Sequence, residues 1–316
     1  MIDFRYHLVS LVSVFLALAV GIVLGAGPLK ESLGDSLNRQ VQALREDRES
    51  LRGDLGRVEI SLEHRDEFLT AVTPKLVADS LAGRKVAVVS VPGADKDTVE
   101  ATEATLRSAG ATLTGRIELT DGWTDADRTD DRLALARSLA PSLLPAESAS
   151  SADLAQVLGA SVLAAEPTGT LTMPPQAAAA LSRLREDRFV RGDRLPTARA
   201  SVAVVVAPPV ATDLSGTDLD RRKADATAWR GVAVALDAAG EGAVVEGPAS
   251  AAGPGGVVEA VRAGDARRSV STVDTGTTPM GPVTAALALA EQIRGQVGHY
   301  GFGDGAAAVL PAGGAS

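Results

Sequence analysis

The sequence predicts an α/β protein in which a single N-terminal transmembrane helix and a long coiled-coil helix precede a mainly parallel α/β body. Three observations predict this class: an uncharged apolar run near the N terminus, a heptad pattern behind it, and short apolar runs that alternate with helical segments from residue 84 onward. We therefore divide the chain into a tail at 1–7, a transmembrane helix at 8–27, a stem at 29–82, and two α/β halves at 84–195 and 196–316.

Composition excludes several classes of protein before any motif is considered. Hydrophobic residues make up 45% of the 316 residues and charged residues 22%, which is the balance of a chain that packs. The net charge of −9 and the aromatic content of 3% argue against a nucleic-acid partner, which needs cations for phosphates and rings for bases. Because the chain has no cysteine, disulfides, thiolate metal sites and cysteine nucleophiles are excluded.

The apolar run at residues 8–26 reads LVSLVSVFLALAVGIVLGA and carries no charge. At about 1.5 Å per residue it is roughly 28 Å long, close to the thickness of a bilayer core. A cleavable signal peptide and a buried core helix are the alternatives. The run exceeds the usual signal-peptide core of about 7–15 residues and is apolar on all sides, so we expect a retained single-pass helix in a lipid bilayer, with the body extracytoplasmic.

Small residues recur every four positions in this run, at Ala17, Gly21 and Gly25. Such a stripe lets two helices approach closely in a membrane. It therefore predicts pairing of the membrane helices of two copies.

A heptad repeat lies beneath the charges of the stem. Its two apolar positions form a seam, which runs along the helix through Leu37, Val41, Leu44, Leu51, Leu55, Val58, Leu62 and Leu69. This spacing keeps one apolar stripe facing a partner helix, so we predict a homo-oligomer held through the stem and the membrane helix. The alternative is a long amphipathic helix that packs on its own domain. Pro74 is expected to end or kink the helix.

The body alternates strand and helix patterns. Strands are predicted at 85–91, 112–119, 201–207, 243–246 and 268–273, and helices at 95–109, 130–139, 153–164, 176–188, 220–239 and 282–294, with a loop at 141–151. The strand–helix–strand pattern of 85–119 recurs at 201–246, which is the basis for a candidate internal duplication.

Parallel sheets bind ligands beyond the carboxyl ends of their strands, which here are residues 90–95, 207–209 and 274–278. Asp95, Asp97 and Asp274 stand there as potential acids or bases, but capping of helices and turns is the favoured interpretation. No serine elbow of the G-x-S-x-G type occurs, and no dinucleotide fingerprint follows a strand. We therefore assign no catalytic residue and no cofactor, and predict that the protein is not an enzyme.

Both ends of the chain carry specific motifs. These are MIDFRYHLVSLVSVFLALAVGIVLG at 1–25, VSTVD at 270–274, TP at 278–279, LALAEQ at 287–292 and GHYG at 298–301. They resemble the actinobacterial MctB family, the mycobacterial copper transport protein B group. The resemblance implies an envelope protein of copper homeostasis, assigned to copper efflux and to pore formation in an outer membrane. Copper is implied by this resemblance alone.

Copper(I) prefers sulfur ligands and also binds imidazole, so Met280 and His299 are the candidate metal ligands. The function predicted by resemblance is a membrane-anchored, self-associating envelope protein of copper transport. Two alternatives stay open. One is a structural or scaffold protein with a coiled-coil spacer, and the other is an anchored α/β enzyme of unknown substrate, whose pocket would form where Ser90, Ala207 and Asp274 converge.

Overall fold

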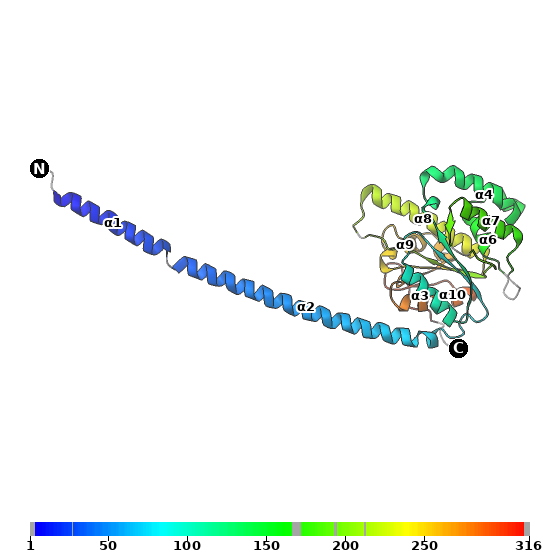
Figure 1. The fold of residues 1–316 in the computed structure, drawn as a ribbon, viewed down its shortest axis with the longest axis horizontal. Helices are drawn as coiled ribbons and strands as arrows, with labels where there is room; N and C mark the ends of the chain where they lie inside the picture. The colour runs from blue at the N-terminus through cyan, green and yellow to red at the C-terminus, as the bar shows by residue number, and fades with distance from the viewer. Residues whose placement is uncertain (1–3, 27, 166–171, 193–194, 212, 313–316) are drawn as a thin grey trace. The chain divides into compact units, whose positions relative to one another are not determined.

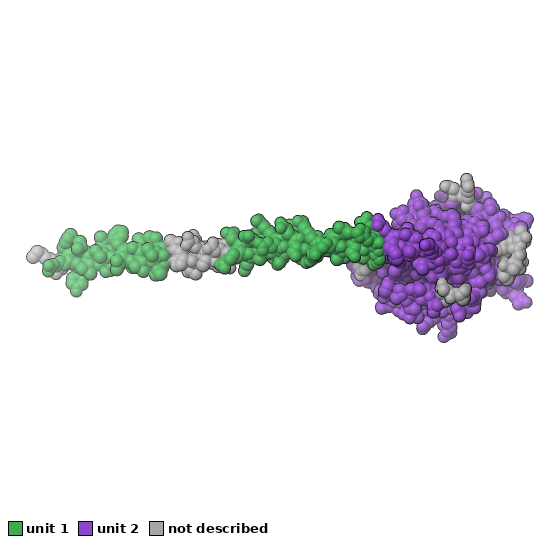
Figure 2. Space-filling view, turned by 90° about the horizontal axis from the view of Figure 1, so that it is seen from below, with its two compact units in different colours: residues 1–65 green, residues 66–316 purple. Residues whose placement is uncertain are grey.

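The computed structural model describes residues 4–26, 28–165, 172–192, 195–211 and 213–312, and for residues 26–36 only the course of the helix. The chain divides into two compact units, residues 1–65 and 66–316, which are coloured separately in Figure 2.

The first unit consists of α1 (Phe4–Ala26) and most of α2 (Pro28–Leu76). Helix α1 begins inside the predicted tail and has no acidic residue in its first turn and no basic residue in its last. Ser13 is accommodated in this apolar helix because its hydroxyl donates to the Val9 carbonyl at 2.8 Å. Gly27, where the predicted membrane helix ends, lies outside the described residues.

The second unit is built on a seven-stranded sheet, which confirms the mainly parallel α/β class. The strands lie in the order β3 (Val190–Arg191), β2 (Thr112–Leu119), β1 (Lys85–Ser90), β4 (Val202–Val206), β5 (Ala243–Glu246), β6 (Ser271–Val273) and β7 (His299–Tyr300). All neighbours are parallel except β2 and β3. The chain moves outward from β1 in one direction and from β4 in the other, so the strand order reverses between them.

Helices cover both faces of this sheet (Figure 1). One face carries α3 (Lys96–Ser108) and α10 (Met280–Ile293). The other carries α4 (Thr129–Leu143), α6 (Leu154–Val162), α7 (Pro175–Glu186), α8 (Gly216–Ala239) and α9 (Val257–Ala263). The remaining helical pieces are α5 (Ala146–Ala149) and the 3₁₀ turns Asp121–Trp123, Ala126–Arg128, Ala249–Ala252 and Asp265–Arg268.

The strands are apolar throughout because both of their faces are buried. In β1, Val86 and Val88 contact the α3–α10 layer, whereas Ala87 and Val89 contact the opposite layer. Successive side chains of a strand point to opposite faces, so a sheet covered on both sides needs a continuous apolar run. The core is accordingly made of alanine, valine and leucine, with few rings.

Several sequence predictions need correction in detail. The loop expected at 141–151 is wrong at its start, because Pro141 lies in the last turn of α4 and α5 follows. Pro74 likewise lies inside the last turn of α2, which runs on to Leu76. The strands β3 and β7 and helix α9 were not predicted. The two strand–helix–strand units adjoin each other through the β1–β4 pair. Their origin by duplication stays a prediction, and so does the division of the chain into five parts.

Candidate functional site

Helix α1 presents apolar side chains on every side. Its residues from Phe4 to Gly25 have a mean hydropathy of 2.7, and none of them is buried. Within the described part of the chain, this is the one helix long and apolar enough to cross a membrane. Large side chains such as Leu8 and Phe15 expose 54% and 62% of their surface. Such exposure is unfavourable in water and suits a lipid environment.

The stripe of small residues is also uncovered. A Cβ added at Gly21 or Gly25 would meet no atom within 4 Å, and Ala17 is exposed. These residues therefore have no packing role within one copy of the chain, and pairing of two membrane helices through them stays a prediction.

The seam of α2 is exposed over most of its length. Its residues from Leu37 to Leu62 leave between 38% and 67% of their surface uncovered. Leu69 is different, because it is half-buried and lines an apolar cavity of about 250 Å³ together with Met280 and other side chains of α10. The alternative of a helix packed on its own domain is thus realised at the C-terminal end of α2, and the seam before it stays open. A coiled coil between copies remains a prediction.

At the carboxyl edge of the sheet, Asp95 acts as the N-cap of α3. Its carboxylate accepts hydrogen bonds from the backbone N–H and the hydroxyl of Thr98, both at 2.8 Å. The backbone hydrogen bond lowers the pKa of Asp95, with the hydroxyl adding to the effect. This is the capping role that the sequence favoured.

Asp274 also has a structural role. It is 1% exposed and forms an ion pair with Arg262 at 2.8 Å. Its oxygens also accept the backbone N–H groups of Phe302 and Gly303, both at 2.9 Å. A Cβ at Gly301 would lie 1.8 Å from one of these oxygens, so the carboxylate needs glycine at that point. Asp274 therefore holds the glycine-rich segment after β7 in place.

The cavity that lies at this edge of the sheet does not combine the three positions predicted for the enzyme alternative. A cavity of about 550 Å³ includes Ser90 in its lining, but neither Ala207 nor Asp274 belongs to it. Pro208 lies against Gly93, where an added Cβ would be 3.4 Å from the Pro208 Cβ. The loops that follow β1 and β4 thus approach each other closely beside this cavity.

Glu246, the last residue of β5, was not singled out by sequence reasoning. Its side chain is fully buried, and burial raises its pKa to about 8. One carboxyl oxygen lies 2.8 Å from the hydroxyl of Thr102, and the other has no hydrogen-bond partner among the described residues. The Thr102 hydroxyl also lies 2.8 Å from the Thr98 carbonyl. One hydroxyl proton cannot serve both acceptors, so a protonated Glu246 that donates to Thr102 fits this arrangement best.

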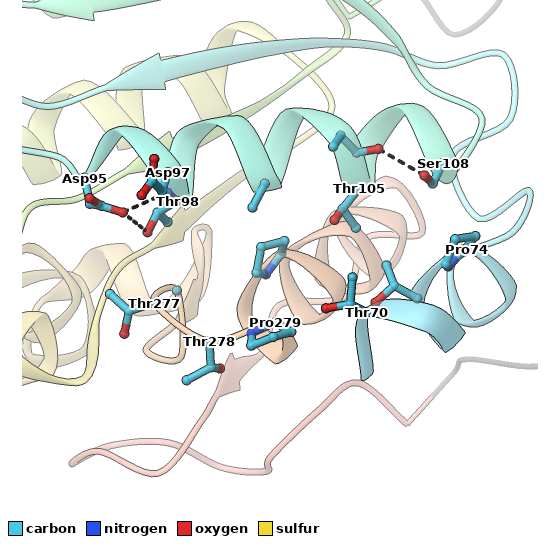
Figure 3. Close-up of a pocket in the computed structure, with 15 residues that line it drawn as sticks. Thr70, Pro74, Asp95, Asp97, Thr98, Thr105, Ser108, Thr277, Thr278 and Pro279 are labelled. Atoms are coloured by element: carbon cyan, nitrogen blue, oxygen red, sulfur yellow. Dashed lines mark hydrogen bonds between the residues drawn. The ribbon is translucent and has the colours of Figure 1, made fainter. Parts of the chain in front are cut away.

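A groove of about 460 Å³ lies between α3, the end of α2 and the start of α10 (Figure 3), and Glu246 is close to one of its lining residues. Gly276 belongs to the groove lining, and a Cβ placed on it would be 3.2 Å from the Cγ of Glu246. The groove is rich in threonine hydroxyls, including Thr70, Thr98 and Thr278. Asp97 and the capping residue Asp95 stand at one end of it. The only sequence signal for Glu246 is that a charged residue stands at the end of the apolar strand β5.

The two candidate copper ligands lie in different surroundings. The Nδ1 of His299 is 2.9 Å from the Thr272 hydroxyl, and its Nε2 is 3.0 Å from the Arg267 carbonyl. Because Arg262 donates to the Thr272 oxygen, the Thr272 proton is free for Nδ1, and Nε2–H donates to the carbonyl. Both ring nitrogens are thus engaged, and burial lowers the pKa of His299, which favours the neutral ring.

Met280 lines the apolar cavity at the end of α2, and His299 is not part of that lining. Among the described residues there is no group of three or more His, Cys, Asp or Glu side chains that could hold a metal ion. The structure does not bring Met280 and His299 into one site. A copper role for either of them stays a prediction, and copper would in any case be cargo of a transporter rather than a resident cofactor.

An exposed apolar helix at the N terminus, a long second helix and a three-layer α/β unit together fit a membrane protein with a large polar domain. Comparison with known proteins identifies the family to which the chain belongs. The family described as "Copper transport outer membrane protein, MctB" matches residues 1–311, so the chain belongs to the MctB family, which confirms the resemblance of its two ends.

Relatives are similar along the whole length. The copper transporter MctB of Mycobacterium tuberculosis is 32% identical over 329 aligned residues, which cover 98% of this chain and 99% of that protein. The protein of the same name from Mycobacterium bovis gives the same values. The copper transporter MctB of Mycobacterium leprae is 30% identical over 327 residues, with the same coverage. The family description names transport rather than a chemical reaction.

Proposed function

We propose that this chain is a membrane-anchored, self-associating protein of copper homeostasis, with α1 crossing the bilayer and the body outside the cytoplasm. The observation that carries the proposal is the uncovered apolar surface of α1 and α2 in a chain of the MctB family. The apolar surface of α1 suits contact with lipid, and the apolar seam of α2 suits contact with the α2 helix of a second copy.

Anchoring is supported by the length of α1. Its 23 residues are about 35 Å long, which exceeds a hydrocarbon core of about 30 Å and allows some tilt. The basic residues that flank the apolar run 8–26, Arg5 before it and Lys30 after it, balance each other, so the orientation rests on the short segment in front of the run. An outer membrane as the host membrane is supported by the family description alone.

Self-association is supported by the spacing of the exposed seam residues. Seven residues between Leu37 and Leu62 repeat with the heptad period and remain uncovered in one chain. Gly53 and Gly56 weaken the helix by about 1 kcal/mol each, so the coil alone would be marginal. Membrane anchoring would compensate by raising the local concentration of stems.

The link to copper is supported by the family, and a cellular experiment tests it. In a host strain that lacks its own family member, we expect the full chain to restore growth at toxic copper concentrations. Residues 28–316 alone are expected to fail, because they lack the membrane helix. Failure of the full chain to change copper sensitivity, with the protein present in the membrane, would contradict the proposal.

A scaffold role is the second candidate, and the length of α2 favours it. Its 49 residues form a rod of about 74 Å, long enough to act as a spacer. Under this alternative, deletion of the gene would disturb cell shape or envelope integrity without sensitising the cells to copper. Under the transport role, copper sensitivity would appear and cell shape would stay normal.

A further inference from the structure

The cavity of about 550 Å³ at the carboxyl edge of the sheet has a charged lining that the proposed function does not use. It opens over the ends of β1 and β2, beside the point where Pro208 packs against Gly93. Parallel sheets of this strand order bind ligands along this edge, next to the reversal of strand order. The cavity is therefore in the position where such a fold offers a binding site.

The sheet places three charged residues on one face of the cavity. Arg116 and Glu118 are two positions apart on β2, so their side chains point to the same side. Arg191 of β3 is the direct cross-strand neighbour of Glu118 and shares that side. Arg116 is fixed there because its Nε donates to Glu103 of α3 at 2.7 Å, which leaves its two terminal amino groups available.

The other charged residues of the lining are Asp121, Arg222 of α8 and Lys96 of α3, and Lys96 lies 3.7 Å from Glu100 on the same helix. Among the residues that the structure describes, neither Arg191 nor Arg222 has a hydrogen-bond or ion-pair partner, and the carboxylates of Glu118 and Asp121 accept no hydrogen bond. Unpaired guanidinium groups that share a cavity stand out in a chain with a net charge of −9.

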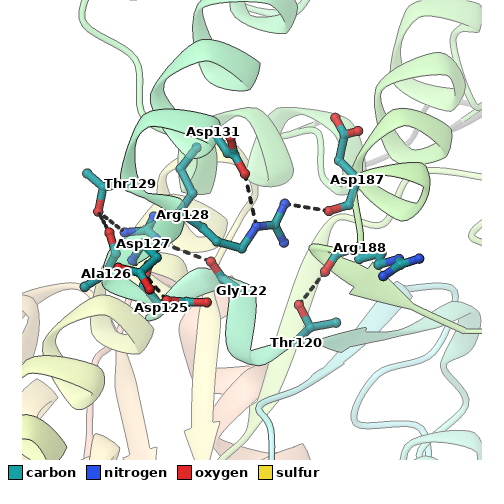
Figure 4. A network of polar contacts seen from close by, with 11 residues as sticks. Thr120, Gly122, Asp125, Ala126, Asp127, Arg128, Thr129, Asp131, Asp187 and Arg188 are labelled. Carbon is teal, nitrogen blue, oxygen red and sulfur yellow. Dashed lines mark hydrogen bonds and ion pairs between the residues drawn. The ribbon is translucent and has the colours of Figure 1, made fainter.

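A polar network connects the turn after β2 with the residues that lead into β3 (Figure 4). The Arg128 guanidinium lies 4.1 Å from the centre of the Phe189 ring and donates to the Asp187 carbonyl at 2.9 Å. The hydroxyl of Thr120 donates to the carbonyl of Arg188 at 2.6 Å, and Arg188 adopts a positive φ of 59°. Strand β3 is thereby fixed against the turn that follows β2, which preorganises the position of Arg191.

The lining chemistry defines a ligand class. Guanidinium groups bind phosphate oxygens with two parallel hydrogen bonds, and acidic side chains at this edge accept hydrogen bonds from sugar hydroxyls. None of the described residues that line the cavity is aromatic, so a nucleobase would find no stacking surface. We propose that this cavity binds a phosphorylated sugar, with Arg191 and Arg222 on the phosphate and Glu118 and Asp121 on the hydroxyl groups.

Calorimetric titration of the full chain in neutral detergent tests this site, with glucose 6-phosphate as the probe and glucose and inorganic phosphate as partial ligands. We expect saturable binding of glucose 6-phosphate at millimolar concentration or below and weaker binding of both partial ligands. Arg191→Gln and Arg222→Gln should each weaken glucose 6-phosphate binding by about tenfold or more, because each removes a charge-assisted hydrogen-bond donor. Asp121→Asn should weaken binding of the sugar phosphate and leave that of inorganic phosphate unchanged.

Arg137→Gln serves as the matched control, because it removes the same charge from an exposed position on α4 that does not line the cavity. We expect it to bind like the wild type. Absence of saturable binding by the wild type would overturn the proposal. Equal losses in Arg137→Gln and Arg191→Gln, or inorganic phosphate binding as tightly as glucose 6-phosphate, would overturn it as well.

Discussion

Glu246 and Asp274 are both buried carboxyl groups at the ends of neighbouring strands, but their partners differ. Asp274 faces the Arg262 guanidinium and two backbone N–H groups, so every part of its carboxylate is compensated. Glu246 faces one hydroxyl, and burial therefore raises the pKa of Glu246 to about 8. The same side-chain chemistry thus makes opposite contributions to stability, and each can be tested by one substitution.

Glu246→Gln should make the stability of residues 66–316 less dependent on pH. The folded state holds the Glu246 proton more tightly than the unfolded chain, since the pKa rises from 4.5 to about 8. The free energy of unfolding should therefore fall as the pH rises through this window, by at most about 1.4 kcal/mol per pH unit from this group. Urea unfolding between pH 5 and 8 measures the slope, which should flatten in Glu246→Gln and persist in the exposed control Glu100→Gln. An unchanged slope in Glu246→Gln would show that Glu246 is ionised in the folded state.

Asp274→Asn should strongly destabilise the same unit, because it leaves the Arg262 guanidinium buried without its counter-charge. Breaking one partner of a buried pair costs about 3–5 kcal/mol. Asp265→Asn is the matched control, since its ion pair with Arg268 at 3.7 Å is on the surface and should contribute nothing measurable. The midpoint of urea unfolding distinguishes the two, and equal midpoints would contradict the structural role of Asp274.

At the scale of elements, α2 changes partner along its length. Up to Leu62 its seam is uncovered, whereas at Leu69 the seam meets α10 of the same chain. Substitutions in the open part should therefore affect association between copies and not the fold of the body.

At protein concentrations where the wild-type fragment of residues 28–316 associates, Leu55→Asp combined with Leu62→Asp should abolish that association, because two charges in the seam would be buried at the interface. Light scattering measures the mass, which should fall to that of a single chain. Ile60→Asp is the control, because Ile60 is 54% exposed on the same helix but lies outside the seam. A mass unchanged by the double substitution would show that the seam is not the interface.

The strands that are buried on both faces were predicted from the sequence. The short strands that form only by pairing with the edge of the sheet were not. The limits of β2 and β5 agree with the predicted ranges, since apolar runs bounded by turns identify buried parallel strands. The two-residue strands β3 and β7 carry no such run and form because an edge is available for pairing. The charged cavity was missed for a similar reason, because Arg116, Arg191 and Arg222 are far apart in the sequence and only the pairing of β2 with β3 and the packing of α8 bring them together.

At the scale of the whole molecule, the chain combines three parts whose apolar surfaces are covered in different ways. Helix α1 and the α2 seam are exposed, and we expect lipid to cover the first and another helix to cover the second. The α/β unit buries its apolar side chains within its own core. Because the sequence has no cysteine, one introduced cysteine supplies the only thiol of the chain. Cross-linking through this thiol can therefore test membrane anchoring and association of the stems in one experiment.

Disulfide cross-linking of the full chain in native membranes is the measurement that tests the account most directly. With Leu55→Cys, oxidation should give a cross-linked dimer in the membrane fraction, because seam residues of two copies lie within disulfide distance. With Ile60→Cys, on the opposite side of the helix, the chain should stay monomeric on a denaturing gel. Recovery of Leu55→Cys in the soluble fraction, or equal cross-linking at the two positions, would contradict a membrane-anchored protein that associates through its stem.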